Sequence, residues 1–123
     1  MKIEVSNGEI VDKMSILQIK SEKIKDTEKL KNIFNEIKFI QKDFLSIMTY
    51  ENSQYVELKR INEMLWQIED DIREKERNKQ FDEDFIELAR SVYVTNDQRA
   101  KIKFEINSST DSNLIEEKSY ESY

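Results

Sequence analysis

The stretch LKNIFNEIKFIQKDFLSI, residues 30–47, decides the fold. Its apolar side chains return at alternating intervals of three and four residues, at Leu30, Ile33, Ile37, Ile40, Phe44 and Ile47. That spacing places them along one side of an α-helix, whereas a half-buried β-strand requires alternation at every second residue. We therefore predict an amphipathic helix here. An average period of about 3.5 residues is typical of helices that pack side by side in bundles.

The same spacing recurs in residues 10–24, 58–72 and 85–106, so we predict three further helices. Side chains that favour helix starts precede the four segments: Ser6 (with Glu9 three residues later), Asp26, Asn52 or Ser53, and Asp82. One glycine and no proline in 123 residues leave too few turn residues for a sheet of this size. The prediction is an all-α antiparallel bundle of about four main helices with a short N-terminal arm. Residues 1–107 form one domain, and residues 108–123 form a polar, acidic C-terminal tail.

The composition excludes several classes of function. The chain has no cysteine and no histidine, so it offers no thiol nucleophile, no imidazole base and no soft metal ligand. A net charge of -6 without a dense basic patch disfavours nucleic-acid binding. The absence of a long apolar run and of a signal peptide predicts a cytoplasmic protein that does not enter a membrane.

Many apolar side chains lie off the four helical stripes, among them Phe34, Phe39 and Trp66. A single layer of four helices of this size covers them poorly, which indicates helices buried on more than one side. We therefore expect a homo-oligomer, with a dimer favoured, and a possible protein partner. Trp66 is the interface candidate, because tryptophan is enriched in protein interfaces.

The stripe of residues 85–106 is interrupted at Thr95 and Arg99. One interpretation is a helix break, because Thr95, Asn96 and Asp97 are residues that favour helix caps. The other is a continuous helix that carries Arg99 into the core, where the guanidinium requires a carboxylate partner. Asp12, Asp97 and Glu69 are the candidates, with Asp70 behind them. We favour a structural role, either a kink or an ion pair.

A functional interpretation of the same segment is a pocket for an anionic small molecule. Arg90 and Arg99 would bind a carboxylate or phosphate through their planar forks, with Tyr93, Asn96 and Asp97 on the same wall. An antiparallel neighbouring helix would contribute Asn62, Glu69 and Arg73.

Pairs of acidic residues support a second alternative. Asp71 and Glu74 close one predicted helix, and Asp84 and Glu87 open the next, so an antiparallel hairpin would place all four carboxylates at one end. Facing carboxylates can hold magnesium for phosphoryl chemistry, as in the all-α nucleotide pyrophosphohydrolases. The motif of that family is not reproduced here, and acidic residues are common in the first turn of a helix. We therefore rank Mg²⁺ binding below the structural interpretation, and expect no cofactor.

The blocks SNGEIVDKMSILQIK (residues 6–20), INEMLWQIED (61–70) and FIELARSVYVTNDQRAKIKFEIN (85–107), with EEKSY (116–120) near the end, carry a resemblance across almost the whole chain. The sequence resembles a family of small, uncharacterised bacterial and phage proteins, sometimes encoded near surface-polysaccharide genes. No catalytic residues can be carried over from the resemblance, because none are established for that family. Together these observations favour an oligomeric helical protein with a partner-interaction or accessory role and without catalysis.

Overall fold

Each helix begins directly after a capping side chain. The computed structural model describes residues 1–123 and contains α1 (Asn7–Lys23), α2 (Thr27–Ile47), α3 (Ser53–Arg77) and α4 (Glu83–Ser109). The N-cap residues are Ser6, Asp26, Asn52 and Asp82, and each side chain accepts a backbone N–H of the first turn. These bonds pair amides that a helix start leaves without a partner. The predicted all-α fold of four main helices is confirmed.

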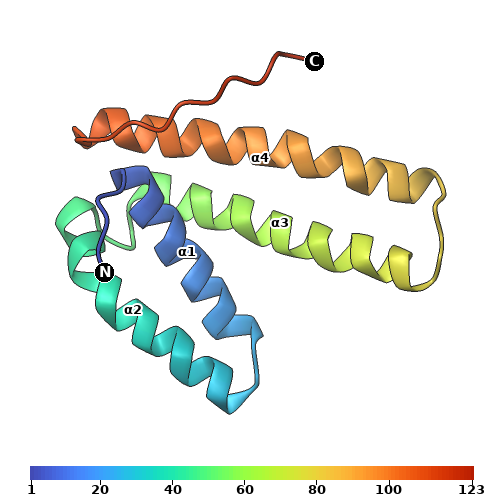
Figure 1. The fold of residues 1–123 in the computed structure, drawn as a ribbon, viewed down its shortest axis with the longest axis horizontal. Coiled ribbons are helices and arrows are strands. Elements are labelled where there is room, and N and C mark those ends of the chain that lie inside the picture. The colour runs from blue at the N-terminus through green and yellow to red at the C-terminus, as the bar shows by residue number, and fades with distance from the viewer.

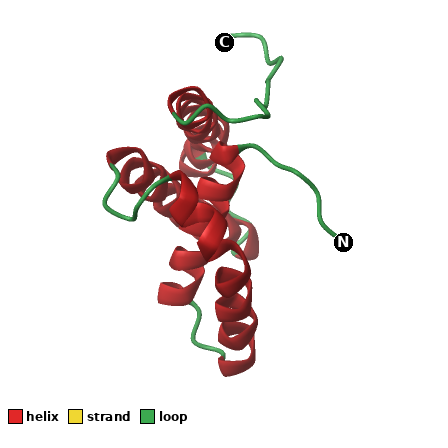
Figure 2. Ribbon diagram, turned by 90° about the vertical axis from the view of Figure 1, so that its left-hand side faces the viewer, coloured by secondary structure: helices red, strands yellow, loops and turns green.

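The four helices form two antiparallel hairpins that diverge from a common end (Figure 1). α1 pairs with α2, α3 pairs with α4, and α1 also contacts α3 and α4, so α1 holds the two hairpins together. The N-terminal arm, residues 1–6, and the tail, residues 110–123, lie outside the helices (Figure 2). None of the helices combines the length and apolar character that a membrane span requires.

The core lies where the two hairpins meet. Its buried cluster draws on all four helices and consists of Val11, Met14, Phe44, Met48, Tyr55, Leu58 and Ile106. Phe44 is fully buried, and its ring lies 4.8 Å from that of Tyr50 and 5.1 Å from that of Tyr55. These residues belong to the start of α1 and α3 and the end of α2 and α4, because antiparallel helices bring alternate ends together.

α4 is continuous, so the helix break considered near Thr95 does not occur. Thr95 lies inside the helix with 3% of its surface exposed, and Asn96 and Asp97 are exposed helical residues. Burial of Thr95 and the ion pair made by Arg99 one turn later favour the helix over the local preference of these residues for a cap. The helix ends at Ser109, two residues beyond the predicted domain boundary.

α3 and α4 extend beyond the helix that covers them. α1 has 17 residues and α3 has 25, so α3 is about 12 Å longer at 1.5 Å per residue. Past the reach of α1, the apolar stripes of the second hairpin are only half-buried. We call this region the overhang and define it by Leu65, Trp66, Ile68, Ile72, Phe85, Leu88 and Val92.

Candidate functional site

A buried carboxylate connects three helices. Asp12 on α1 is 1% exposed and accepts hydrogen bonds from Arg99 on α4 through both carboxylate oxygens, with 3.0 Å between Nε and Oδ1. Asn62 on α3 donates its side-chain amide to Asp12 Oδ1 at 2.9 Å and to the hydroxyl of Ser15 at 2.8 Å. Ser15 donates in turn to the backbone carbonyl of Asp12 at 2.7 Å. Of the carboxylates considered as partners for Arg99, the structure selects Asp12.

Lys103 lies one turn beyond Arg99 and is nearly buried, with 11% of its side chain exposed. Its ammonium group is 2.8 Å from Glu9 Oε2, 4.0 Å from Asp12 Oδ2 and 3.7 Å from Glu116 Oε1 in the tail. Glu9 follows the cap residue Ser6 as in a capping box, but its carboxylate pairs with Lys103. The hydrogen bond to Asp12 raises the pKa of Arg99, and burial opposes that effect. Each of the two cations thus has a carboxylate partner on α1.

Gly8 allows α1 to approach α4 closely enough for these contacts. A Cβ atom at this position would lie 2.5 Å from the backbone carbonyl oxygen of Lys103. The Gly8 amide donates to Asn107 Oδ1 at 2.6 Å, and the Asn7 amide donates to Ser112 Oγ at 2.9 Å. A larger residue would separate the two helices, since backbone atoms cannot rotate away as a side chain can.

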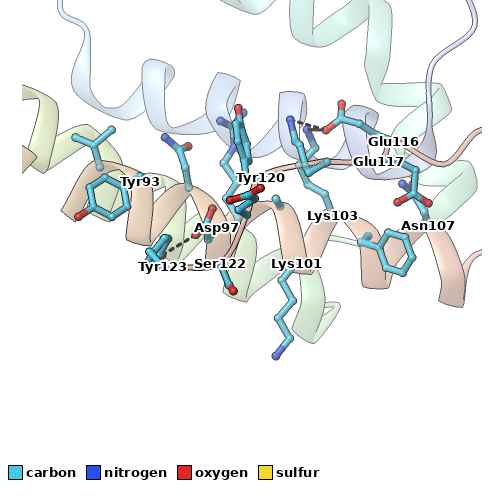
Figure 3. A pocket seen from close by; sticks show the side chains of 17 residues that line it. Tyr93, Asp97, Lys101, Lys103, Asn107, Glu116, Glu117, Tyr120, Ser122 and Tyr123 are labelled. Atoms are coloured by element: carbon cyan, nitrogen blue, oxygen red, sulfur yellow. Dashed lines mark hydrogen bonds and ion pairs between the residues drawn. The ribbon is translucent and has the colours of Figure 1, made fainter. Parts of the chain in front are cut away.

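The tail and the outer side of α4 enclose a groove of about 1000 Å³ (Figure 3). Arg99 and Lys103 line its floor, and the predicted residues Tyr93, Asn96 and Asp97 line its wall. The phenol of Tyr123 donates to Asp97 Oδ2 at 2.6 Å, and its ring meets the ring of Tyr93 edge to face at 5.1 Å. The tail therefore occupies the side of α4 on which we predicted a pocket.

The other residues predicted for this pocket lie elsewhere. Asn62 joins the Arg99 network, but from the buried side. Glu69 and Arg73 form a pair 3.2 Å apart on the exposed part of α3, and neither lines the groove. Arg90 is exposed on α4 outside the groove, and a hydrogen bond with Tyr93 raises its pKa. The structure thus differs from the expected pocket with two guanidinium groups, because Arg90 and Arg99 face different sides of α4.

The four carboxylates considered for magnesium do line one groove, of about 580 Å³, between α3 and α4. They are Asp71, Glu74, Asp84 and Glu87. Lys75 lies among them, 3.7 Å from Asp84 Oδ2, and Arg77 pairs with Glu74. No three acidic side chains of the structure are close enough to hold a metal ion together. Magnesium binding stays a prediction.

A family model described as a family of unknown function (DUF6165) matches residues 1–123, the whole chain. The protein belongs to this family. Neither the curated proteins nor the solved structures that were compared contain a match. The family description assigns no activity. We therefore infer the roles of individual residues from the geometry of this structure.

Sequence reasoning found some members of the network and missed others. Asn62, Asp12 and Arg99 were considered, whereas Glu9, Ser15, Lys103 and Asn107 were not. The single glycine was the available signal, because a lone Gly in a helix often marks a close backbone approach. Asp12 and Ser15 are at most 1% exposed, and every buried polar side-chain atom has a partner. This arrangement holds three helices together and presents two neutralised cations at the floor of the groove.

Proposed function

We propose that this protein is a non-catalytic interaction protein that acts as a homodimer. The observation that carries the proposal is the amount of surface left uncovered. The chain exposes 8759 Å², whereas a compact monomer of 14.8 kDa exposes about 7000 Å². The extended arm and tail and the divergence of the two hairpins all add exposed surface. An excess of about 1800 Å² per chain is larger than the roughly 800 Å² that a specific interface of ordinary size buries on each partner.

The overhang is the surface we assign to the dimer. Asn62 faces α1, and Trp66 follows one helical turn later on the same side of α3, where α1 no longer covers it. Half-buried apolar residues continue from there to the end of the hairpin, with Met64 exposed beside them. Two such hairpins from two copies would complete a four-helix arrangement and bury the stripes that one hairpin leaves open.

A partner role in the cell follows from the same proposal. The closed ion network around Asp12 supports a structural function for Arg99 rather than substrate binding. The resemblance to small bacterial and phage proteins sometimes encoded near surface-polysaccharide genes supports an accessory role in surface-carbohydrate or phage biology.

Light scattering after size-exclusion chromatography tests the dimer. We expect the wild-type protein at micromolar concentration to have twice the chain mass of 14.8 kDa. Trp66→Asp should shift it to the monomer, because a charge at this position cannot be buried without a partner. Phe39→Asp is the matched control, since Phe39 is 75% exposed on α2 outside the overhang. A monomeric wild-type protein, or a Trp66→Asp variant as dimeric as the wild type, would overturn the proposal.

A further inference from the structure

We propose that the groove on α4 recognises an extended acidic peptide segment that carries tyrosines, presented by another protein. The chain's own tail forms one wall of this groove and covers the side of α4 that forms the other, so it acts as an internal competitor for that side. The inference rests on the proposed function as an interaction protein, but it uses a surface that shares only Val92 with the overhang. The partner segment is defined by the features of the tail, namely its carboxylates and its tyrosines.

The charges of the groove and of the tail are complementary. On the α4 side, the charged residues that line the groove are Arg99, Lys101, Lys103 and Asp97. On the tail side they are Glu116, Glu117, Glu121 and Lys118. Cations therefore dominate the side of α4 that the tail covers, and carboxylates dominate the tail, so a segment that replaces the tail should be acidic as well. Glu116 delivers one of these carboxylates to Lys103, at 3.7 Å.

Aromatic contacts supply the second element of recognition. Tyr93 and Phe104 are 44% and 43% exposed even with the tail in place, and both line the groove. They lie on one side of α4, with Ala100 between them, and form a stripe separate from the one that faces α1 and α3. Tyr123 covers part of this stripe by its contact with Tyr93, as Figure 3 shows. A tyrosine of a partner segment can make the same edge contact and the same hydrogen bond to Asp97.

The tail is held in a way that permits exchange. No backbone amide of residues 113–123 donates a hydrogen bond, and the segment contains no helix or strand. Asp111, at the start of the tail, has a φ of 52° in the turn that ends α4, which the Ser112 amide closes by donating to the Asn107 carbonyl at 3.0 Å, so exchange involves residues 113–123 alone. Segments with few contacts and exposed backbone open at low free energy. Release of the tail would free the groove without disturbing the core, because none of the core residues belongs to the tail.

A peptide fits these observations better than a small anion does. Arg99 and Lys103 already have Asp12 and Glu9 as carboxylate partners, so the contact from Glu116 to Lys103 is a supplementary one, and it holds the tail only together with the aromatic contact at Tyr93. The contacts that hold the tail extend from Lys103 to Tyr93, about three helical turns, and an extended segment reaches both ends at once.

Fluorescence anisotropy with a labelled synthetic peptide of residues 113–123 tests the inference. The full-length wild-type protein is compared with a full-length variant whose tail is loosened, E116Q/Y123A. The loosened variant should bind the peptide at least about tenfold more tightly, because the internal competitor is weakened. Adding Tyr93→Ala to this variant should reverse the gain, whereas Val94→Ala, also exposed on α4 but outside the groove, should not.

Three results would overturn the inference. The first is equal peptide affinity of the wild-type and loosened proteins. The second is unchanged binding after Tyr93→Ala. The third is displacement of the peptide by phosphate or citrate together with equal binding of a peptide that lacks its tyrosines, which would assign the groove to small anions. Light scattering on the same variants separates this inference from the dimer. A protein that is dimeric but binds no peptide would refute only peptide recognition by the groove. A protein that binds the peptide but is monomeric would refute only dimerisation.

Discussion

The guanidinium of Arg99 on α4 donates two hydrogen bonds to the carboxylate of Asp12 on α1, although the two residues are 87 positions apart in the chain. Asp12 is almost completely buried. The side-chain amide of Asn62 donates hydrogen bonds to the Asp12 carboxylate and to the Ser15 hydroxyl beside it. An ion pair of this kind adds little stability over an apolar contact, but its parts cannot be removed singly without a large penalty. The pair therefore specifies how the two hairpins join.

Arg99→Ala should destabilise the protein strongly. It leaves the Asp12 carboxylate buried without its main counter-charge, which costs about 3–5 kcal/mol in comparable buried pairs. Arg77→Ala, which removes an exposed pair with Glu74 within α3, should cost less than about 1 kcal/mol. Urea unfolding followed by circular dichroism measures both values. Equal and small losses for the two variants would show that the Asp12 pair is not a structural requirement. Asp12→Asn combined with Arg99→Gln should recover part of the loss, because neither side chain then carries a buried charge.

Gly8→Ala should destabilise the protein, although the same change in an ordinary helix is stabilising. The new Cβ atom would lie 2.5 Å from the Lys103 carbonyl oxygen, so α1 and α4 must separate. Overpacking of this kind costs about 1–3 kcal/mol, whereas a free helical position gains up to about 1 kcal/mol from Gly to Ala. Thermal unfolding determines the sign. Lys23→Ala, at an exposed position of α1, controls for helix propensity. A rise in the melting temperature of Gly8→Ala would contradict the close approach of the two helices.

Phe44→Ala should cost about 3–5 kcal/mol, because it empties the centre of the core where all four helices meet. Phe39→Ala, five residues earlier in the same helix, should change the free energy of unfolding by less than about 0.5 kcal/mol, since Phe39 is 75% exposed. Denaturant unfolding of the two variants compares the same substitution on two sides of α2. Similar losses of unfolding free energy in the two variants would contradict the placement of the core on the Phe44 side of α2.

The attachment of the tail should depend on pH in two ranges. Hydrogen bonding from Lys118, which lies in the tail itself, lowers the pKa of Glu116 below its ordinary value of 4.5, and Lys103 on α4 contributes to the same lowering. The contact with Lys103 is the part that attaches the tail to α4. Its stabilising contribution is therefore present above about pH 4.5 and is lost as the pH falls through the lowered pKa. The hydrogen bond to Asp97 raises the pKa of Tyr123 above 10.0, so this contribution is present below pH 10 and is lost as the pH rises through the raised pKa.

NMR chemical shifts of Tyr93 and Lys103 follow this release across the acid range. We expect both to move together as the acidic contact is lost, with circular dichroism unchanged at the onset. Glu116→Gln should remove the acid transition that Tyr93 and Lys103 share, and leave at Lys103 only the effect of Glu9, which lies 2.8 Å away. Glu105→Gln, an exposed carboxylate of α4 that does not line the groove, should leave the shared transition intact. If the shared acid transition survives in Glu116→Gln, it belongs to another titrating group and the prediction is wrong.

The helices could be predicted because their signals are local. The stripe from Leu30 to Ile47 and the caps at Ser6, Asp26, Asn52 and Asp82 depend only on neighbours within about one helical turn. Part of the site could be predicted as well, since a polar residue in an apolar stripe marked Arg99, and its need for a carboxylate brought Asp12 into consideration. The distances that selected Asp12 over Glu69 and Asp97 depend on how α1 crosses α4, and no local pattern carries that angle.

The sequence by itself determined four helices, their starting points and the position of a charged residue in a buried stripe. Only the tertiary structure decided that α4 continues through Thr95, that Asp12 neutralises Arg99, and that the tail covers the side of α4 that carries Tyr93. The physical reason is the range of the interactions. Hydrogen bonds within a helix and its caps join residues three or four positions apart, whereas the free energy of a buried ion pair or of a covered groove depends on groups that only folding brings together.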